Sequence, residues 1–324
     1  MRLPALIRRL AQGLLLLLLV ASATFALVHA APGEPFASQV DDPRVTPAMR
    51  ATLRRQYGLD QPLAVQYVRY VRALASGDLG RSLARQRPVR ALLADAMPRT
   101  VLLGGTALLL AAVAGIAVGV RQARAPGSRF DRITTRACVA LAAIPDFWLA
   151  LGLIAVFSVR LGWTPVSGMA DPVTHDFLSP LARLADTARH LALPALTLAL
   201  LLGAAIARQQ RVALLAVLPE RFVRTARGKG APDAAVLRRH ALPHALRPTI
   251  VLLGLALPSL LGGVVFIEAI FDWPGMGRLA LDALAARDYP VVLGATVVGS
   301  ALVVLGTLAA DLALVALDPR GRDA

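Results

Sequence analysis

The chain contains a series of apolar runs, each close to the length that crosses a lipid bilayer as a helix. About 20 consecutive apolar residues are needed to span the hydrocarbon core. An α-helix suits this environment because it satisfies its own backbone hydrogen bonds. Such runs occupy residues 10–28, 100–120, 137–159, 191–207, 248–267 and 289–310. The sequence therefore predicts an all-α, polytopic membrane protein with six transmembrane helices embedded in the lipid bilayer.

The first apolar run has two interpretations. Arginines precede it and Val28-His29-Ala30 resembles a cleavage site, so the run could be a removable signal peptide. Because similar runs follow it, we expect a retained transmembrane helix within an N-terminal segment of residues 1–30.

A polar region of residues 31–99 separates the first run from the second. Apolar positions recur at helical spacing in residues 47–57 and 62–74, between clusters of turn-forming residues. We expect short amphipathic helices on the outer membrane face there, and a third at residues 89–97 that leads into the next run. The remaining five spans form a transmembrane core at residues 100–320.

Basic residues indicate the orientation. The formal net charge is +15, but aromatic residues make up only 5% and the arginines are spread between apolar runs, so nucleic acid is not the expected partner. Short basic segments at residues 121–136 and 208–247 lie on the same side as the N-terminal arginines. Since cytoplasmic loops carry an excess of Lys and Arg, both termini are predicted to be cytoplasmic.

The sequence lacks the motifs of an enzyme. Lys229, the only lysine, is followed by Gly230, so a phosphate-binding loop of the Gly-Lys-Ser/Thr type is absent. The single Cys138 lies in an apolar run, where we expect it to pack rather than bind metal. We therefore expect no ATP hydrolysis by this chain, no cofactor and no metal.

The basic segment 208–247 carries the signals of a short helix. Pro232 suits a first helical turn and Asp233 the positive end of the helix. Arg238 and Arg239 suit the negative end, and Leu242-Pro243 is expected to stop the helix.

A helix of about ten residues is too short to be stable alone in water. Either the protein's own helix ends or a partner's groove must hold it, and Val236, Leu237 and Ala241 are available as anchors for a partner. The alternative is a solvated basic loop that only obeys the charge rule for topology.

Two acidic residues are candidates for a transport pathway or gate. Asp146 lies deep in an apolar run, where ionisable groups are costly and often functional. The alternative is that backbone donors freed beside Pro145, or water, satisfy Asp146. Glu268 lies nearer the end of a run, where we expect solvation to be easy.

The basic segment 208–247 resembles the cytoplasmic signature of the permeases of binding-protein-dependent ABC importers. The family pattern is Glu-Ala-Ala, three residues, Gly, nine or more residues, then a hydrophobic residue, any residue and Leu-Pro. This chain has Arg224-Thr225-Ala226, Gly230 and Ala241-Leu242-Pro243, so it departs at the Glu and at the first Ala. This variant resembles the dipeptide/oligopeptide branch of the family.

Further motifs along nearly the whole chain resemble the same branch. In order they are Arg8-Arg9-Leu10, Pro32-Gly33-Glu34-Pro35, Tyr57-Gly58-Leu59-Asp60-Gln61-Pro62, Gly77-Asp78-Leu79-Gly80-Arg81-Ser82, Ile144-Pro145-Asp146-Phe147-Trp148, Phe271-Asp272-Trp273-Pro274-Gly275-Met276-Gly277, Arg287-Asp288-Tyr289-Pro290 and Asp318-Pro319-Arg320. Their order and spacing make the resemblance specific. The long first outer region is typical of the first of the two permease subunits.

The resemblance implies a type I importer permease in the inner membrane. It would work as a heterodimer with a second permease subunit, two cytoplasmic ATPase subunits and an extracytoplasmic solute-binding protein, and would import small peptides by ATP-coupled alternating access. Residues 230–242 would be the coupling helix, seated in a groove of an ATPase. The residues expected to form the coupling loop are Arg224, Thr225, Ala226, Gly230, Pro232, Asp233, Val236, Leu237, Arg238, Arg239, Leu242 and Pro243.

Two other functions are open at this stage. The same machinery carries nickel or its chelates, glutathione or another small solute in related systems. An ion-coupled secondary transporter with Asp146 as the ion site is the alternative from a different class. Folds of that class usually show internal repeats, and none is visible in this sequence.

Overall fold

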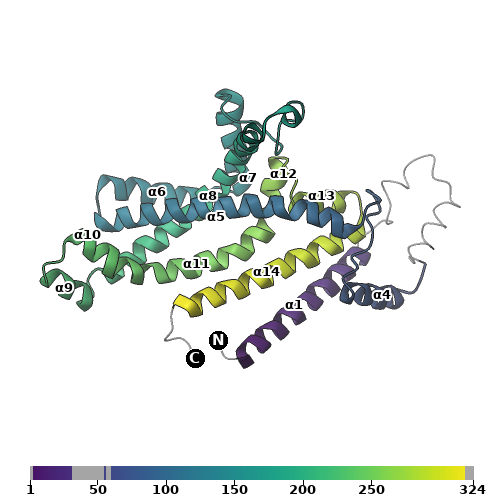
Figure 1. Cartoon of the computed structure of the whole chain (residues 1–324), viewed down its shortest axis with the longest axis horizontal. Coiled ribbons are helices and arrows are strands. Elements are labelled where there is room, and N and C mark those ends of the chain that lie inside the picture. The colour runs from purple at the N-terminus through teal and green to yellow at the C-terminus, as the bar shows by residue number, and fades with distance from the viewer. Residues whose placement is uncertain (1–2, 31–54, 56–59, 318–324) are drawn as a thin grey trace. The chain divides into compact units, whose positions relative to one another are not determined.

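The computed structural model describes residues 3–30, 55 and 60–317. The helix expected at residues 47–57 lies outside the described residues, Arg55 excepted. Within the described part every regular element is a helix, and the only extended pairing is one isolated bridge between Arg81 and Pro88 (Figure 1). The predicted all-α class is confirmed.

Four helices of the described part are long and apolar enough to cross a membrane: Ile7–Ala30, Val89–Arg124, Pro180–Val217 and Tyr289–Ala309. A fifth candidate is the pair Arg129–Ala143 and Asp146–Arg160, which is bent by 110°. The predicted run 248–267 falls on α11 (Leu242–Gly263) and α12 (Val265–Ile270), which are divided at Val264. Four or five spans are thus observed, and the predicted six are not confirmed.

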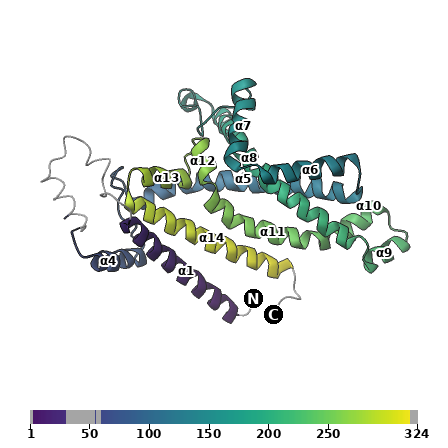
Figure 2. The ribbon, with the colours of Figure 1, turned by 180° about the vertical axis from the view of Figure 1, so that it is seen from behind.

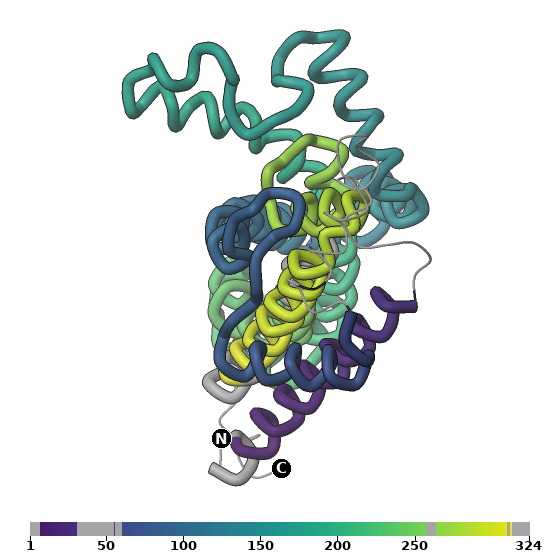
Figure 3. The backbone as a smooth tube through the Cα atoms, turned by 90° about the vertical axis from the view of Figure 1, so that its right-hand side faces the viewer, coloured from purple at the N-terminus to yellow at the C-terminus, as the bar shows by residue number. Residues whose placement is uncertain are grey.

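One compact unit comprises residues 7–100 and 274–302. It contains most of α1 (Leu3–Ala30), α4 (Leu63–Ala75), the start of α5 (Val89–Arg124), α13 (Met276–Ala285) and the start of α14 (Tyr289–Leu317). Helix α4 confirms the amphipathic helix predicted at residues 62–74. It crosses the C-terminal part of α1, where the hydroxyls of Ser22 and Tyr67 are 2.7 Å apart (Figure 3).

The separate helix predicted at residues 89–97 is instead the first part of α5. Pro98 lies inside this helix and removes one backbone hydrogen bond. Tertiary packing on both sides of Pro98 keeps the helix continuous: Leu93 is buried in the apolar core before it, and the Thr100 hydroxyl accepts a hydrogen bond from the Met276 N–H (2.8 Å) after it.

Of the described residues, the other unit comprises 3–6, 101–273 and 303–317. Helix α8 (Pro180–Val217) packs against α11, against α6 (Arg129–Ala143) and against α7 (Asp146–Leu153). The remaining elements are η1 (Ile154–Arg160), η2 (His175–Phe177), α9 (Arg221–Gly228), α10 (Asp233–Val236) and η3 (Leu237–Ala241). Between the predicted runs 137–159 and 191–207 the chain becomes helical well before residue 191, because the Ser179 hydroxyl accepts a hydrogen bond from the Ala182 N–H and α8 begins at Pro180.

The chain breaks between α6 and α7 where the sequence predicted an interruption. Ile144 and Pro145 are both extended, with ψ angles of 127° and 142°, and they separate the two helices. A residue before proline avoids the helical region, which explains why the break falls at Ile144. Figure 2 shows α7 leaving the direction of α6.

The stretch 268–288 connects the predicted runs 248–267 and 289–310, and it is not the open polar turn that its Pro and Gly residues suggest. Helices α12 and α13 occupy most of it, and the side chains of Phe271 and Trp273 in the connection are 2% and 0% exposed. The Phe271 carbonyl accepts a hydrogen bond from the Gly168 N–H (2.8 Å). Apolar burial therefore outweighs the turn-forming Pro274 and Gly275.

Candidate functional site

The basic segment begins with the end of α8, which includes residues 208–217. It continues with α9, a short amphipathic helix that the sequence did not suggest and that buries Val223 and Ala226. Its polar side is held by local bonds: the Arg224 Nε donates to the Pro219 carbonyl (2.8 Å), and the Thr225 hydroxyl donates to the Arg221 carbonyl (2.9 Å).

Gly230 ends this helix in a left-handed conformation. Its φ is +80°, which glycine adopts at little cost, and its N–H donates to the Arg227 carbonyl (2.9 Å). A side chain at Gly230 would meet no atom within 4 Å, so its conformation, rather than space, favours glycine here. Across the turn, the Arg227 Nε donates to Asp233 at 3.2 Å in an exposed ion pair.

The predicted helix from Pro232 is present, but Leu242-Pro243 does not stop it. Helix α10 continues through the π-type turn η3 into α11, in which Pro243 occupies the first turn. A proline lacks an N–H and collides with the carbonyl four residues earlier in a regular helix. The wider π turn immediately before Pro243 avoids this conflict, so the chain passes from the short helix into a long one without a break.

The short helix is held by the protein's own helix ends. Val236 and Ala241 are 1% and 0% exposed and pack with Leu214 of α8 and Val223 of α9. They are therefore not available as anchors for a partner, and Leu237 is half-buried beside them. The protein's own helix ends therefore hold the buried side of this short helix.

The opposite side of the segment is exposed and basic. It presents side chains from α9, from the turn and from η3 to solvent. The predicted coupling residues on this side are Arg224, Thr225, Gly230, Pro232, Asp233, Arg238, Arg239 and Pro243, whereas Ala226 is buried and Leu242 is half-buried. The structure thus separates the predicted set into a supporting apolar face and an exposed polar face.

An ion pair between the half-buried Arg211 and the buried Asp131 braces the part of α8 that lies in the basic segment, and sequence reasoning missed it. The Arg211 guanidinium donates to both carboxylate oxygens of Asp131 on α6, at 2.7 and 2.9 Å. Asp131 also accepts from the Gly127 N–H (2.9 Å) and the Thr135 hydroxyl (3.2 Å). Because the partners are separated by 80 residues, no local pattern could have found the pair.

Asp146 lies at the first position of α7, directly after the break. One of its carboxylate oxygens accepts the Phe147 N–H at 2.8 Å, and the side chain is half-buried. This is a contact with a backbone donor at a helix start, as in the structural alternative. Asp146 and Glu268 lie on different helices of the same unit, and Asp146 keeps its place as a candidate for the pathway.

Glu268 is fully buried, which corrects the expectation of easy solvation. It is 0% exposed on α12, and its neighbours in the sequence Ile267, Phe271 and Trp273 belong to one buried apolar cluster. The apolar core around the connection 271–275 covers this position, although it lies near the end of a predicted span. A buried carboxyl group requires hydrogen-bonded partners to persist there.

Within the described residues, no group of three or more His, Cys, Asp or Glu side chains is arranged to hold a metal ion. Cys138 is buried against Ala204 and Ala207 of α8. The segment 221–243 presents an exposed basic face to solvent.

Comparisons with known proteins find a matching family model and similar sequences over nearly the whole chain. Residues 111–323 match the family model described as "Binding-protein-dependent transport system inner membrane component", and residues 2–104 match the model of its N-terminal region. The chain is 39% identical to the "Oligopeptide transport system permease protein AppB" of Bacillus subtilis, over 97% of this chain and 98% of the relative. It is 40% identical to the "Di/tripeptide transport system permease protein DppB" of Pseudomonas aeruginosa, over 92% and 93%.

A solved structure shares the fold. The MetNI methionine ABC transporter in an inward-facing conformation superposes with a TM-score of 0.53 at 21% sequence identity, over 71% of this chain and 97% of that one.

Proposed function

The chain belongs to the family of binding-protein-dependent transport system inner membrane components, and we propose that it is one permease subunit of an ABC importer of small peptides. It is a multi-pass protein of the inner membrane and a transport component. The cargo is inferred from relatives: permeases named for oligopeptides, di- and tripeptides and dipeptides align with nearly all of this chain.

The observation that carries the proposed mechanism is the two-sided construction of residues 221–243. One side packs into the protein's own apolar core, and the other presents Arg224, Arg238 and Arg239 to solvent. A displacement of this surface would move α8 and α11 with it. The reason is that α9, η3 and α11 pack together and that Leu214 of α8 belongs to the same apolar cluster. A freely moving loop could not do so.

We assign this surface to the contact with a cytoplasmic ATPase subunit. In the proposed assembly, two ATPase subunits bind and hydrolyse ATP, a second permease completes the pathway, and an extracytoplasmic solute-binding protein delivers the peptide. Closure of the ATPases would move the exposed face of the segment and, through its buried face, the helices of the bundle. Asp146 and Glu268 are proposed positions on the pathway or gate.

The test is uptake of a radiolabelled dipeptide by proteoliposomes that contain this chain, its second permease, the ATPases and the binding protein. We expect uptake that requires ATP. Gly230→Asp should reduce it several-fold at normal membrane levels, because the variant adds a carboxylate to the basic face at a left-handed turn position that glycine adopts at least cost. Uptake that proceeds without ATP, or that Gly230→Asp leaves unchanged, contradicts the proposal.

Gly228→Asp is the matched control. It adds the same carboxylate two residues earlier, at a glycine that has ordinary backbone angles and no neighbouring atom within 4 Å of an added side chain. Uptake by this variant should remain closer to that of the unaltered protein.

A further inference from the structure

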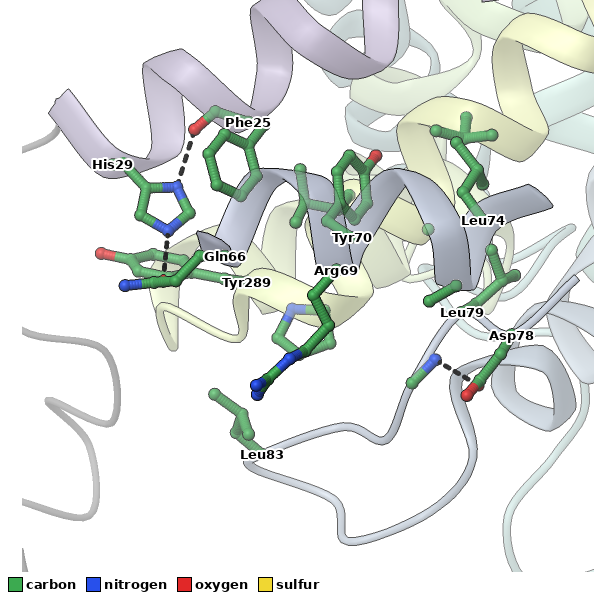
Figure 4. Close-up of a pocket in the computed structure, with 16 residues that line it drawn as sticks. Phe25, His29, Gln66, Arg69, Tyr70, Leu74, Asp78, Leu79, Leu83 and Tyr289 are labelled. Atoms are coloured by element: carbon green, nitrogen blue, oxygen red, sulfur yellow. Dashed lines mark hydrogen bonds between the residues drawn. The ribbon is translucent and has the colours of Figure 1, made fainter. Parts of the chain in front are cut away.

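An apolar groove lies among α1, α4 and the first turns of α14, all within one compact unit (Figure 4). Its volume is about 250 Å³. The wall is formed by aromatic and aliphatic side chains from the three helices and from the loop after α4. These side chains are Phe25, Tyr70, Leu74, Leu79, Leu293 and Val297.

The aromatic side chains of the wall pack against one another. The rings of Phe25 and Tyr70 stack at 5.5 Å with an interplanar angle of 20°, and the Phe25 ring meets Tyr67 edge-on at 5.4 Å. Burial, with a smaller contribution from Tyr67, raises the pKa of Tyr70 to about 12, so the phenol stays neutral and adds no charge to the groove. The wall therefore suits an uncharged apolar occupant.

Polar side chains gather where the groove reaches the ends of two membrane spans. His29 precedes the end of the span Ile7–Ala30, and Tyr289 begins the span Tyr289–Ala309. Gln66 of α4 is 3.3 Å from the His29 Nε2. Leu293 and Val297 follow about one and two helical turns deeper along α14. The groove thus runs from the level of the membrane interface into the hydrocarbon region.

Arg69 supplies a cation at the groove. Figure 4 shows its side chain reaching from α4 toward the loop that carries Leu83. No ion pair joins the Arg69 guanidinium to a carboxylate in the part of the chain that the structure describes. Next to it, α4 exposes Leu63 and Val68, each by 55%, as a helix lying at a membrane interface does.

We propose that this groove is a binding site for a phospholipid, with one acyl chain along the apolar wall and the phosphate group at Arg69. A guanidinium is well suited to a phosphate, because its planar set of N–H donors matches the phosphate oxygens. Basic residues beside apolar grooves between membrane helices bind lipid head groups elsewhere by the same chemistry. The site does not depend on the identity of the transported cargo.

The occupant can be identified with a benzophenone side chain placed at residue 70 of the chain in bacterial membranes. Tyr70 is a half-buried aromatic residue that lines the groove, so the photoreactive ring replaces a ring already present in the wall. After irradiation, mass spectrometry of the cross-linked product should show an added phospholipid. A cross-link to residues 31–59 of the same chain, to a second copy or to another protein would overturn the proposal.

The role of Arg69 is tested with purified full-length protein in vesicles of phosphatidylethanolamine and phosphatidylglycerol that contain a trace of phospholipid with a photoactivatable acyl chain. Arg69→Gln should lower labelling of the groove peptides about tenfold, as expected for loss of a charge-assisted hydrogen bond. Arg72→Gln is the matched control, since Arg72 is an exposed arginine of the same helix that does not line the groove.

A second photoprobe, a diacylglycerol without phosphate, isolates the phosphate contact. Its labelling should be equal in unaltered protein and Arg69→Gln. Ala73→Trp, which fills the groove, should reduce labelling by both probes. Equal labelling by the phospholipid probe in Arg69→Gln and Arg72→Gln would contradict the phosphate contact, and labelling that Ala73→Trp leaves unchanged would contradict the groove as its place.

Discussion

Asp288 binds the loop around Ser82, although the two residues are 206 positions apart. The Ser82 hydroxyl donates to the Asp288 carboxylate, as do the backbone N–H groups of Leu83 (3.0 Å) and Ala84 (3.1 Å). Asp288 is 2% exposed and directly precedes α14, so one buried carboxylate joins the loop before α5 to the start of α14. The two motifs at residues 77–82 and 287–290, which are far apart in the sequence, are thus joined by the hydrogen bonds of the Asp288 carboxylate.

We predict that Asp288→Asn destabilises this unit by about 2 kcal/mol, because an amide keeps one acceptor but turns N–H groups toward donors. Purified protein should melt at a lower temperature, and proteases should cut within residues 81–87 sooner. Asp282→Asn is the control: Asp282 pairs with Arg85 at 3.2 Å, but both side chains are 48% exposed. Such a pair contributes about 0–1 kcal/mol, so the control should melt close to the unaltered protein. Similar melting temperatures of the Asp288→Asn and Asp282→Asn variants would contradict a stabilising role for the buried Asp288 carboxylate.

Gly115 and Gly119 form a contact surface on α5 for α8. A side-chain carbon at Gly119 would lie 2.5 Å from the Ala207 carbonyl oxygen, and one at Gly115 would lie 2.8 Å from that of Gly203. Small residues spaced by four allow such close approach of membrane helices. Gly119→Ala should therefore lower stability by about 1–3 kcal/mol or more, since a backbone atom cannot move aside easily.

Gly105 provides a control for Gly119 on the same helix. It has no neighbouring atom within 4 Å, so Gly105→Ala should be neutral or slightly stabilising. The measurement is the temperature at which each detergent-solubilised variant aggregates. Equal temperatures for the two alanine variants would show that α5 and α8 do not approach this closely.

The effects on stability of substituting Asp131 and Arg211 should depend on each other. Their side chains are 5% and 28% exposed, so Asp131→Asn leaves a half-buried guanidinium without its counter-charge and should cost about 2 kcal/mol. The double variant Asp131→Asn with Arg211→Gln should recover part of this loss, because no unpaired charge remains. A melting-temperature double-mutant cycle measures the coupling. Additive losses in the two single variants would show that the side chains do not interact.

Local patterns predicted the parts of the fold that local forces determine. The apolar runs, helix α4 and the break at Pro145 follow from residue spacing and proline geometry. The burial of Glu268, the packing of Val236 and the continuation through Pro243 depend on elements that meet only in the folded chain. For the same reason the basic segment could be located from the sequence, whereas its division into a buried face and an exposed face could not.

ATP hydrolysis by the reconstituted transporter tests whether the exposed basic face of residues 221–243 contacts the ATPase. Charge reversal by Arg238→Glu together with Arg239→Glu changes only exposed side chains of η3, and Arg72→Glu on α4 serves as a control for charge reversal elsewhere. We predict that the double variant reaches normal membrane levels but loses most of the ATP hydrolysis that the peptide-loaded binding protein stimulates, while Arg72→Glu keeps it. Full stimulation in the double variant would contradict the assignment of this surface to the ATPase.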